Sequence, residues 1–188
     1  MIILWGLVLG LPLLAFGGAA LLCPSLARRF AAWFETSKGC AAVLTTVGWL
    51  WAAHECDVIG IDVFDAILLK DRTGGMFVWV LAAVLAYLTC IWMPKNLPVR
   101  ALTGILMLIP AELFRTTRLL LPESGFAAVD LFVVTGYLGA IVGMYGMFYP
   151  WRLEKGLAAV LGNGAATRAL GALLSLWGLS LVVTAFFV

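Results

Sequence analysis

Six apolar stretches, each close to the length of a membrane-crossing helix, constrain this chain more than any other feature. A helix needs about 20 apolar residues to cross the hydrocarbon core of a bilayer. Hydrophobic residues make up 64% of the chain and charged residues 12%, whereas soluble domains are roughly half apolar and a quarter charged. The sequence therefore predicts an all-α polytopic bundle forming a single integral membrane domain over residues 1–188, and it excludes a soluble enzyme. The expected spans cover residues 2–23, 39–54, 74–93, 97–121, 126–149 and 169–188.

The basic residues indicate how these spans are oriented. Lys and Arg collect in the cytoplasmic loops of membrane proteins, and most of the 12 in this chain fall in the turns that follow the first, third and fifth spans. Each of these turns opens with a proline, namely Pro24, Pro94 and Pro150, and proline is a good helix stop. The sequence thus predicts three helical hairpins with both termini outside, in a membrane that we expect to be the bacterial inner membrane.

Two segments are expected to lie on the membrane surface. Residues 57–70 form an outer interfacial helix in this interpretation, because apolar and acidic residues fall on different faces. Residues 25–38 similarly place aromatic side chains at the inner headgroups. Two short echoes, of residues 38–44 in 155–161 and of 100–102 in 168–170, are explained better by convergence at cytoplasmic helix starts than by duplication, because their order does not map one half onto the other.

An outer-face polar cluster follows the second span. Its members are His54, Glu55, Asp57, Asp62 and Asp65. Histidine and carboxylates can bind metals, but consecutive helical residues point in different directions and neither an HxxxH nor a CxxC motif is present. We therefore predict no metal site, and interpret the cluster as a wet helix end, with a metal or proton-relay role as the alternative.

An intramembrane charge cluster lies in the fourth and fifth spans. Glu112, Arg115 and Arg118 recur every three residues and share one side of a helix, and Glu112 is about 18 Å from the inner surface at 1.5 Å per residue. An unpaired charge at this depth is costly, so we expect Arg115 to pair with Glu112. Asp130, at a similar depth, is expected to bridge the fourth and fifth spans. Structural pairing is favoured, and ligand or ion handling is the alternative.

Small residues form stripes that favour close helix packing. Gly136, Gly139, Gly143 and Gly146 follow one face of the fifth span, and Gly6 and Gly10 have the GxxxG spacing in the first. A comparable stripe in the sixth span is expected to face that of the fifth. It consists of Gly171, Ser175 and Gly178.

The functional prediction follows from these features together. The chain has no nucleotide-binding, metalloprotease or hydrolase motif, no cofactor is expected, and a net charge of +2 does not favour a nucleic-acid partner. We predict a non-catalytic subunit of a multi-protein membrane complex or a homo-oligomer, docking through its glycine faces and acidic outer surface. The alternatives are a small transporter or channel using Glu112 and Asp130, and a lipid-headgroup enzyme using His54 or Glu55 as base with Arg115 or Arg118 binding phosphate.

Overall fold

The fold is built from helices throughout the part of the chain that the structure describes. This structure is a computed structural model, and it describes residues 2–59, 73–92, 96–118 and 126–187. Within these ranges eight helices and no strand are found. They are α1 (Ile2–Leu22), α2 (Pro24–Thr36), α3 (Lys38–Ile59), α5 (Thr73–Trp92), α6 (Leu97–Arg118), α7 (Phe126–Phe148), α8 (Pro150–Gly162) and α9 (Gly164–Phe187).

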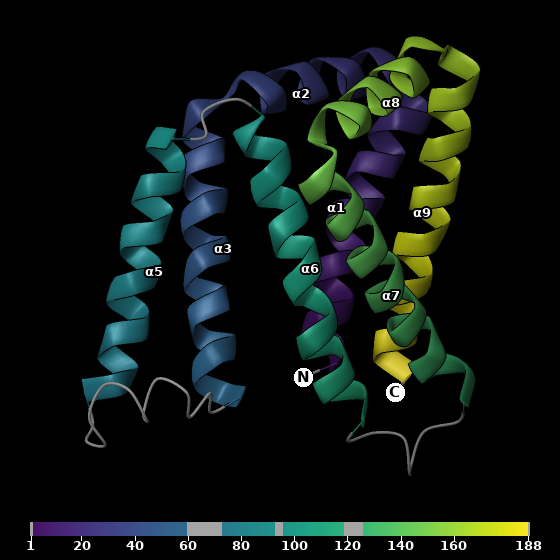
Figure 1. Cartoon of the computed structure of the whole chain (residues 1–188). Coiled ribbons are helices and arrows are strands. Elements are labelled where there is room, and N and C mark those ends of the chain that lie inside the picture. Colours follow the sequence, from purple (N-terminus) through teal and green to yellow (C-terminus); the bar gives the residue numbers. More distant parts are fainter. Residues whose placement is uncertain (1, 60–72, 93–95, 119–125, 188) are drawn as a thin grey trace.

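The long and the short helices have different places in the bundle. α1, α3, α5, α6, α7 and α9 stand roughly upright, while α2 and α8 lie across one end, at the top of Figure 1. Both chain ends lie at the opposite end of the bundle. Proline starts both crossing helices, because its missing N–H costs nothing in the first turn. The chain therefore changes direction sharply after α1, at Pro24, and after α7, at Pro150.

Four helices are long and apolar enough to cross a membrane. They are Ile2–Leu22, Leu97–Thr117, Val129–Phe148 and Gly164–Phe187. The described apolar part of α5, Phe77–Trp92, is shorter, and α3 carries Lys38 at its start and His54, Glu55 and Asp57 near its end. Length and hydropathy thus support four spans directly, whereas the sequence predicts six.

The expected spans and the observed helices differ mainly around α8. Residues 150–162 were expected to belong to a turn, but they form a 13-residue helix, and α9 begins at Gly164 rather than at residue 169. Leu153, Leu157 and Leu161 give α8 one apolar side, and Leu161 is buried. The outer interfacial helix expected over residues 57–70 lies largely outside the described residues.

The backbones of α1 and α9 pack closely against each other at small residues. A Cβ on Gly17 of α1 would lie 2.6 Å from the backbone nitrogen of Ser175, and one on Gly10 would lie 2.8 Å from the carbonyl oxygen of Gly178. On α9, a Cβ on Gly171 would lie 2.6 Å from the backbone nitrogen of Leu21. The small stripe of the last span thus faces α1, and the expectation that it faces the glycines of α7 is wrong.

The glycine stripe of α7 packs on α6 instead. A Cβ on Gly143 would lie 2.8 Å from the Thr103 carbonyl oxygen, and one on Gly139 would lie 3.4 Å from the carbonyl oxygen of Leu106. The Leu106 carbonyl is the one that Pro110 leaves without its intrahelical N–H donor. Glycine at position 139 therefore lets the α7 backbone approach α6 where α6 has an unused acceptor.

The segments α1–α2–α3 and α7–α8–α9 share one pattern. Gly10 and Gly136, Gly17 and Gly143, and Pro24 and Pro150 are separated by the same number of residues. At the same spacing, Ser37 accepts a hydrogen bond from the Cys40 N–H at 3.3 Å and Asn163 accepts one from the Ala165 N–H at 3.0 Å, so each caps the helix that follows. The short echoes in the sequence do not follow this spacing, since residue 38 begins α3 whereas residue 155 lies inside α8.

Candidate functional site

The acidic residue deepest in α6 is paired within its own helix. Glu112 is buried, and its Oε1 accepts a hydrogen bond from the guanidinium of Arg115, one turn further on. The Arg115 side chain is 41% exposed, whereas that of Glu112 is 9% exposed. Glu112 Oε2 is also buried, and it has no hydrogen-bond partner in the described part of the chain. The pair thus satisfies one carboxylate oxygen and leaves the other unsatisfied.

The neighbouring threonine hydroxyls do not donate to Glu112 Oε2. Thr116 Oγ1 donates to the Glu112 backbone carbonyl at 2.8 Å, and Thr117 Oγ1 donates to that of Leu113, also at 2.8 Å. Both threonines are buried. Bonding back to the preceding turn is the usual way for a buried helical threonine to satisfy its hydroxyl, and it takes the donor away from the Glu112 side chain.

A second buried carboxylate lies on α3. Glu55 is 7% exposed, and its Oε1 accepts a hydrogen bond from the indole N–H of Trp51 at 3.0 Å. The Trp51 ring stacks on that of Trp5 of α1, with 5.7 Å between centroids and an interplanar angle of 25°. Trp51 also packs against the core cluster that contains Ile109 and Leu113 of α6. The Glu55–Trp51 pair therefore lies at the contact between α1, α3 and α6.

The two carboxylates come from neighbouring helices at similar depth. α3 and α6 pack together and run in the same direction, away from the end that α2 and α8 cover. Glu55 is 17 residues beyond Lys38, and Glu112 is 15 beyond Leu97, which places them about 26 and 22 Å from the starts of their helices at 1.5 Å per residue. Both lie towards the end of the bundle that carries the chain ends.

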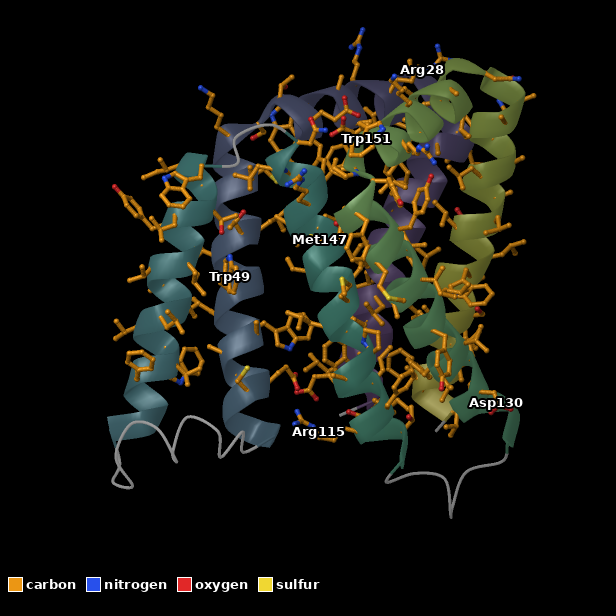
Figure 2. The ribbon with its side chains drawn as sticks, viewed as in Figure 1. Arg28, Trp49, Arg115, Asp130, Met147 and Trp151 are labelled. Carbon is orange, nitrogen blue, oxygen red and sulfur yellow. The ribbon has the colours of Figure 1, made fainter. Side chains whose placement is uncertain are left out.

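Asp130 does not join this arrangement. Figure 2 shows Arg115 near the lower end of α6 and Asp130 at the far side, on the first turns of α7. Asp130 is exposed, and the partner of Arg115 is Glu112 rather than Asp130. The expected bridge between Arg115 and Asp130 is therefore not formed. The side chain of Arg118 lies outside the described part of the chain, so a contact between Arg118 and Asp130 stays a prediction.

The outer-face polar cluster is only partly described. His54 is exposed while the adjacent Glu55 is buried, as expected for consecutive helical residues. The side chains of Asp57, Asp62 and Asp65 lie outside the described residues. Among the side chains that are described, no group of three His, Cys, Asp or Glu residues is placed to hold a metal ion.

Two interhelical hydrogen bonds were not anticipated from the sequence. The indole N–H of Trp49 on α3 donates to Thr89 Oγ1 on α5 at 3.2 Å, and that of Trp177 on α9 donates to Thr135 Oγ1 on α7 at 3.1 Å. Each threonine donates in turn to the carbonyl oxygen four residues earlier, Leu85 and Leu131 respectively. Only the rotation of the packed helices reveals such pairs, although Trp and Thr in apolar spans are a recognisable signal.

The arrangement gives the two buried carboxylates, Glu112 and Glu55, a partner one turn away in the same helix, and its helices are joined by small residues and indole–hydroxyl bonds. Comparisons with protein-family models, with curated proteins and with solved structures find no match to this chain. The class therefore follows from the fold itself: the described residues are all helical, and their four long apolar helices have the length and composition of an integral membrane protein.

Proposed function

We propose that this chain is a non-catalytic subunit of a membrane complex, docking another membrane protein or a second copy of itself. In this proposal it crosses the bacterial inner membrane six times as three hairpins, with α2 and α8 at the cytoplasmic surface and both termini outside. The single observation that carries the docking role is the position of α5, which packs against α3 and has most of its other described side chains uncovered by the other described helices.

The uncovered surface of α5 is large and aromatic. Trp79, Val80, Val84, Tyr87 and Trp92 are all exposed, Tyr87 at 67%. A bilayer can cover such a surface, but among the described helices α5 packs mainly against α3, whereas α6 packs on both α3 and α7. Each of the other long helices packs on at least two described helices. An additional helix beside α5 would give α5 a second neighbour as well.

The glycine faces are a less suitable docking surface than the sequence predicts. Gly6 and Gly10 pack on α9, and Gly136, Gly139, Gly143 and Gly146 pack on α6 or on side chains next to it. Because these faces are occupied within the chain, the proposal assigns docking to α5. A role for the acidic segment around Asp62 and Asp65 stays part of the proposal.

A photo-crosslinking amino acid at position 87 tests the docking role directly. The matched control is position 173 on α9, where Leu173 is 60% exposed but lies on a helix already packed against α1. We expect a discrete protein adduct from position 87 and only lipid adducts from position 173, with the adduct mass separating a second copy from another subunit. Lipid adducts alone from both positions would contradict the docking role.

The membrane orientation has its own test. In a variant whose four cysteines are replaced by serine, Lys155→Cys on α8 and Asp130→Cys on α7 introduce exposed thiols near opposite ends of the bundle. A membrane-impermeant maleimide should label position 130 in intact cells and position 155 only after permeabilisation. The reversed labelling pattern would overturn the proposed topology without affecting the fold.

A small transporter is the second candidate, because Glu112 Oε2 is buried and none of the described residues forms a hydrogen bond with it. A carboxylate oxygen of this kind in a membrane span is where an ion or a proton could bind. The purified chain in proteoliposomes, assayed for flux of protons, sodium and potassium, separates the two functions. The subunit proposal expects no flux above that of empty vesicles, whereas flux that Glu112→Gln abolishes and Asp130→Asn preserves would favour the transporter.

A further inference from the structure

We propose that the edge of α2 formed by Leu26, Arg29 and Trp33 is a binding site for the headgroup of an anionic phospholipid. Arg29 is its main phosphate contact. The inference rests on the proposed embedding of the bundle in a bilayer. It adds a ligand class and a site that the docking role does not require.

α2 presents three different sides. Ala27 is buried against Ala20 of α1 and Leu161 of α8, and Ala31 packs against the same cluster. Leu26, Phe30 and Trp33 form a second side at helical spacings of four, three and seven residues, and each is more than half exposed. The first side joins α2 to the protein, so the second is left facing the surroundings.

The exposed apolar side lies next to α1 at Phe30. The Phe30 ring contacts that of Phe16 on α1, at 6.2 Å between centroids, and that of Trp33 at 5.7 Å. Since α1 is a candidate span and α2 lies across its end, this row of side chains lies at the level where a span leaves the hydrocarbon. Aromatic residues concentrate at that level in membrane proteins.

The two arginines of α2 differ in their relation to this apolar side. Arg29 is three residues from Leu26 and four from Trp33, so it borders the apolar row. Arg28 is on the third side, which it shares with Glu35 two turns further on. Both side chains are exposed. Arg29 is therefore placed for a phosphate at the lipid–water boundary, whereas Arg28 is further from the lipid and nearer an acid.

The charge around this edge favours an anion. Exposed basic side chains on the same end of the bundle include Lys38 and, on α8, Arg152 and Lys155. The acids of the same two helices are Glu35 on α2 and Glu154 on α8. A guanidinium binds phosphate through paired N–H donors, and basic residues at a membrane surface attract anionic lipids by about 1 kcal/mol each. A phosphate ester on an acyl chain satisfies both the arginine and the apolar row.

Lipid titration of the full-length chain in detergent tests the proposal. The probes are phosphatidylglycerol, phosphatidylcholine and inorganic phosphate, and the readouts are bound lipid by native mass spectrometry and the shift in melting temperature. We expect phosphatidylglycerol to bind more tightly than phosphatidylcholine. Arg29→Gln should weaken phosphatidylglycerol binding by about fivefold, and the matched control Arg28→Gln by less than about twofold.

The remaining arms distinguish the source of the phosphate. Inorganic phosphate should stabilise the wild-type chain much less than phosphatidylglycerol, and Trp33→Ala should weaken lipid binding while leaving any effect of inorganic phosphate unchanged. Equal losses for Arg28→Gln and Arg29→Gln, or equal stabilisation by inorganic phosphate and phosphatidylglycerol, would overturn the proposal. Neither result depends on crosslinking at position 87, so the lipid site and the docking role can fail independently.

Discussion

The indole N–H of Trp177 on α9 donates a hydrogen bond to the hydroxyl of Thr135 on α7 at 3.1 Å, and Thr135 donates in turn to the Leu131 carbonyl at 2.7 Å. The Thr135 hydroxyl therefore joins the side chain of one helix to the backbone of another. Trp49 and Thr89 repeat the arrangement between α3 and α5. Such bonds are among the few directional contacts available between apolar helices in a bilayer.

Replacing the indole donor should destabilise the bundle modestly. Trp177→Phe keeps an aromatic ring but removes the N–H, and Thr135 retains its bond to Leu131. We expect the free energy of unfolding in mixed micelles to fall by about 0.5–1.5 kcal/mol. Trp49→Phe should have a similar effect. If the double variant of Trp177→Phe and Thr135→Val loses as much stability as the two single variants together, the bond contributes nothing.

Adjacent glycines on α1 should respond oppositely to alanine. A Cβ at Gly17 meets the α9 backbone, whereas a Cβ at Gly18 meets nothing within 4 Å. Gly17→Ala should cost about 1–3 kcal/mol because the two backbones must separate. Gly18→Ala should be neutral or slightly stabilising, because alanine is the better helix former. The measurement is the melting temperature of the two variants, purified in parallel. Equal melting temperatures would argue against the α1–α9 contact.

The Glu112–Arg115 pair should be asymmetric. Glu112→Gln leaves behind an arginine that is partly exposed and can reach the headgroups, whereas Arg115→Gln leaves a buried carboxylate without its donor. Arg115→Gln should therefore destabilise the protein by about 1–3 kcal/mol more than Glu112→Gln. Chemical unfolding in micelles measures both, and the double variant should be close to Glu112→Gln alone. Equal costs for the single variants would mean that Glu112 is not held as a buried charge.

Stability should depend on the ionisation of Glu154. Burial raises the pKa of the Glu154 carboxyl above its ordinary value of 4.5, and the nearby carboxylate of Glu35 on α2 raises it further. Because the folded state binds this proton more tightly than the unfolded state, the resulting stabilisation is complete below the ordinary pKa. It is lost as the pH rises through the higher folded-state pKa.

The size of this effect should be below about 1 kcal/mol, because much of the group remains solvated. Melting temperatures are measured at pH values from about 4 upwards, in steps of about one pH unit. With rising pH they should fall less steeply for Glu154→Gln than for the wild-type chain. Glu35→Gln should flatten the profile partially, since it removes only the second cause. An unchanged profile in Glu154→Gln would show that another group controls the pH dependence.

Periodicity and hydropathy predicted the long helices because each carries its own signal. Helix α6 starts at Leu97 as expected and α7 starts at Phe126. The 13 residues of α8 are predicted as part of a turn because Pro150 opens them and basic residues follow, although the leucines at 153, 157 and 161 repeat every four residues. A proline at the start of a helix and one that ends a helix are alike in sequence.

The pairing of helices was harder to predict than the helices themselves. The stripes on α1, α7 and α9 are chemically equivalent, so composition alone could not decide that Gly143 faces α6 while Gly17 faces α9. The partner of Glu55 could have been found, because Trp51 precedes it by one turn. Its approach to α6 depends on the rotation of α3, which a single sequence does not encode locally.

The contact between α1 and α9 joins the first and the last of the described helices. During synthesis, Gly10 and Gly17 are without their packing partner until α9 has also been made, since α9 follows every other described helix. α1 therefore completes its packing late, although it precedes the other described helices. The packing of the bundle depends on contacts that are distant in sequence, and such contacts form slowly. A ribosome that stalls before α9 would leave a partly assembled bundle in which the glycine face of α1 is uncovered, and a quality-control protease could recognise that face.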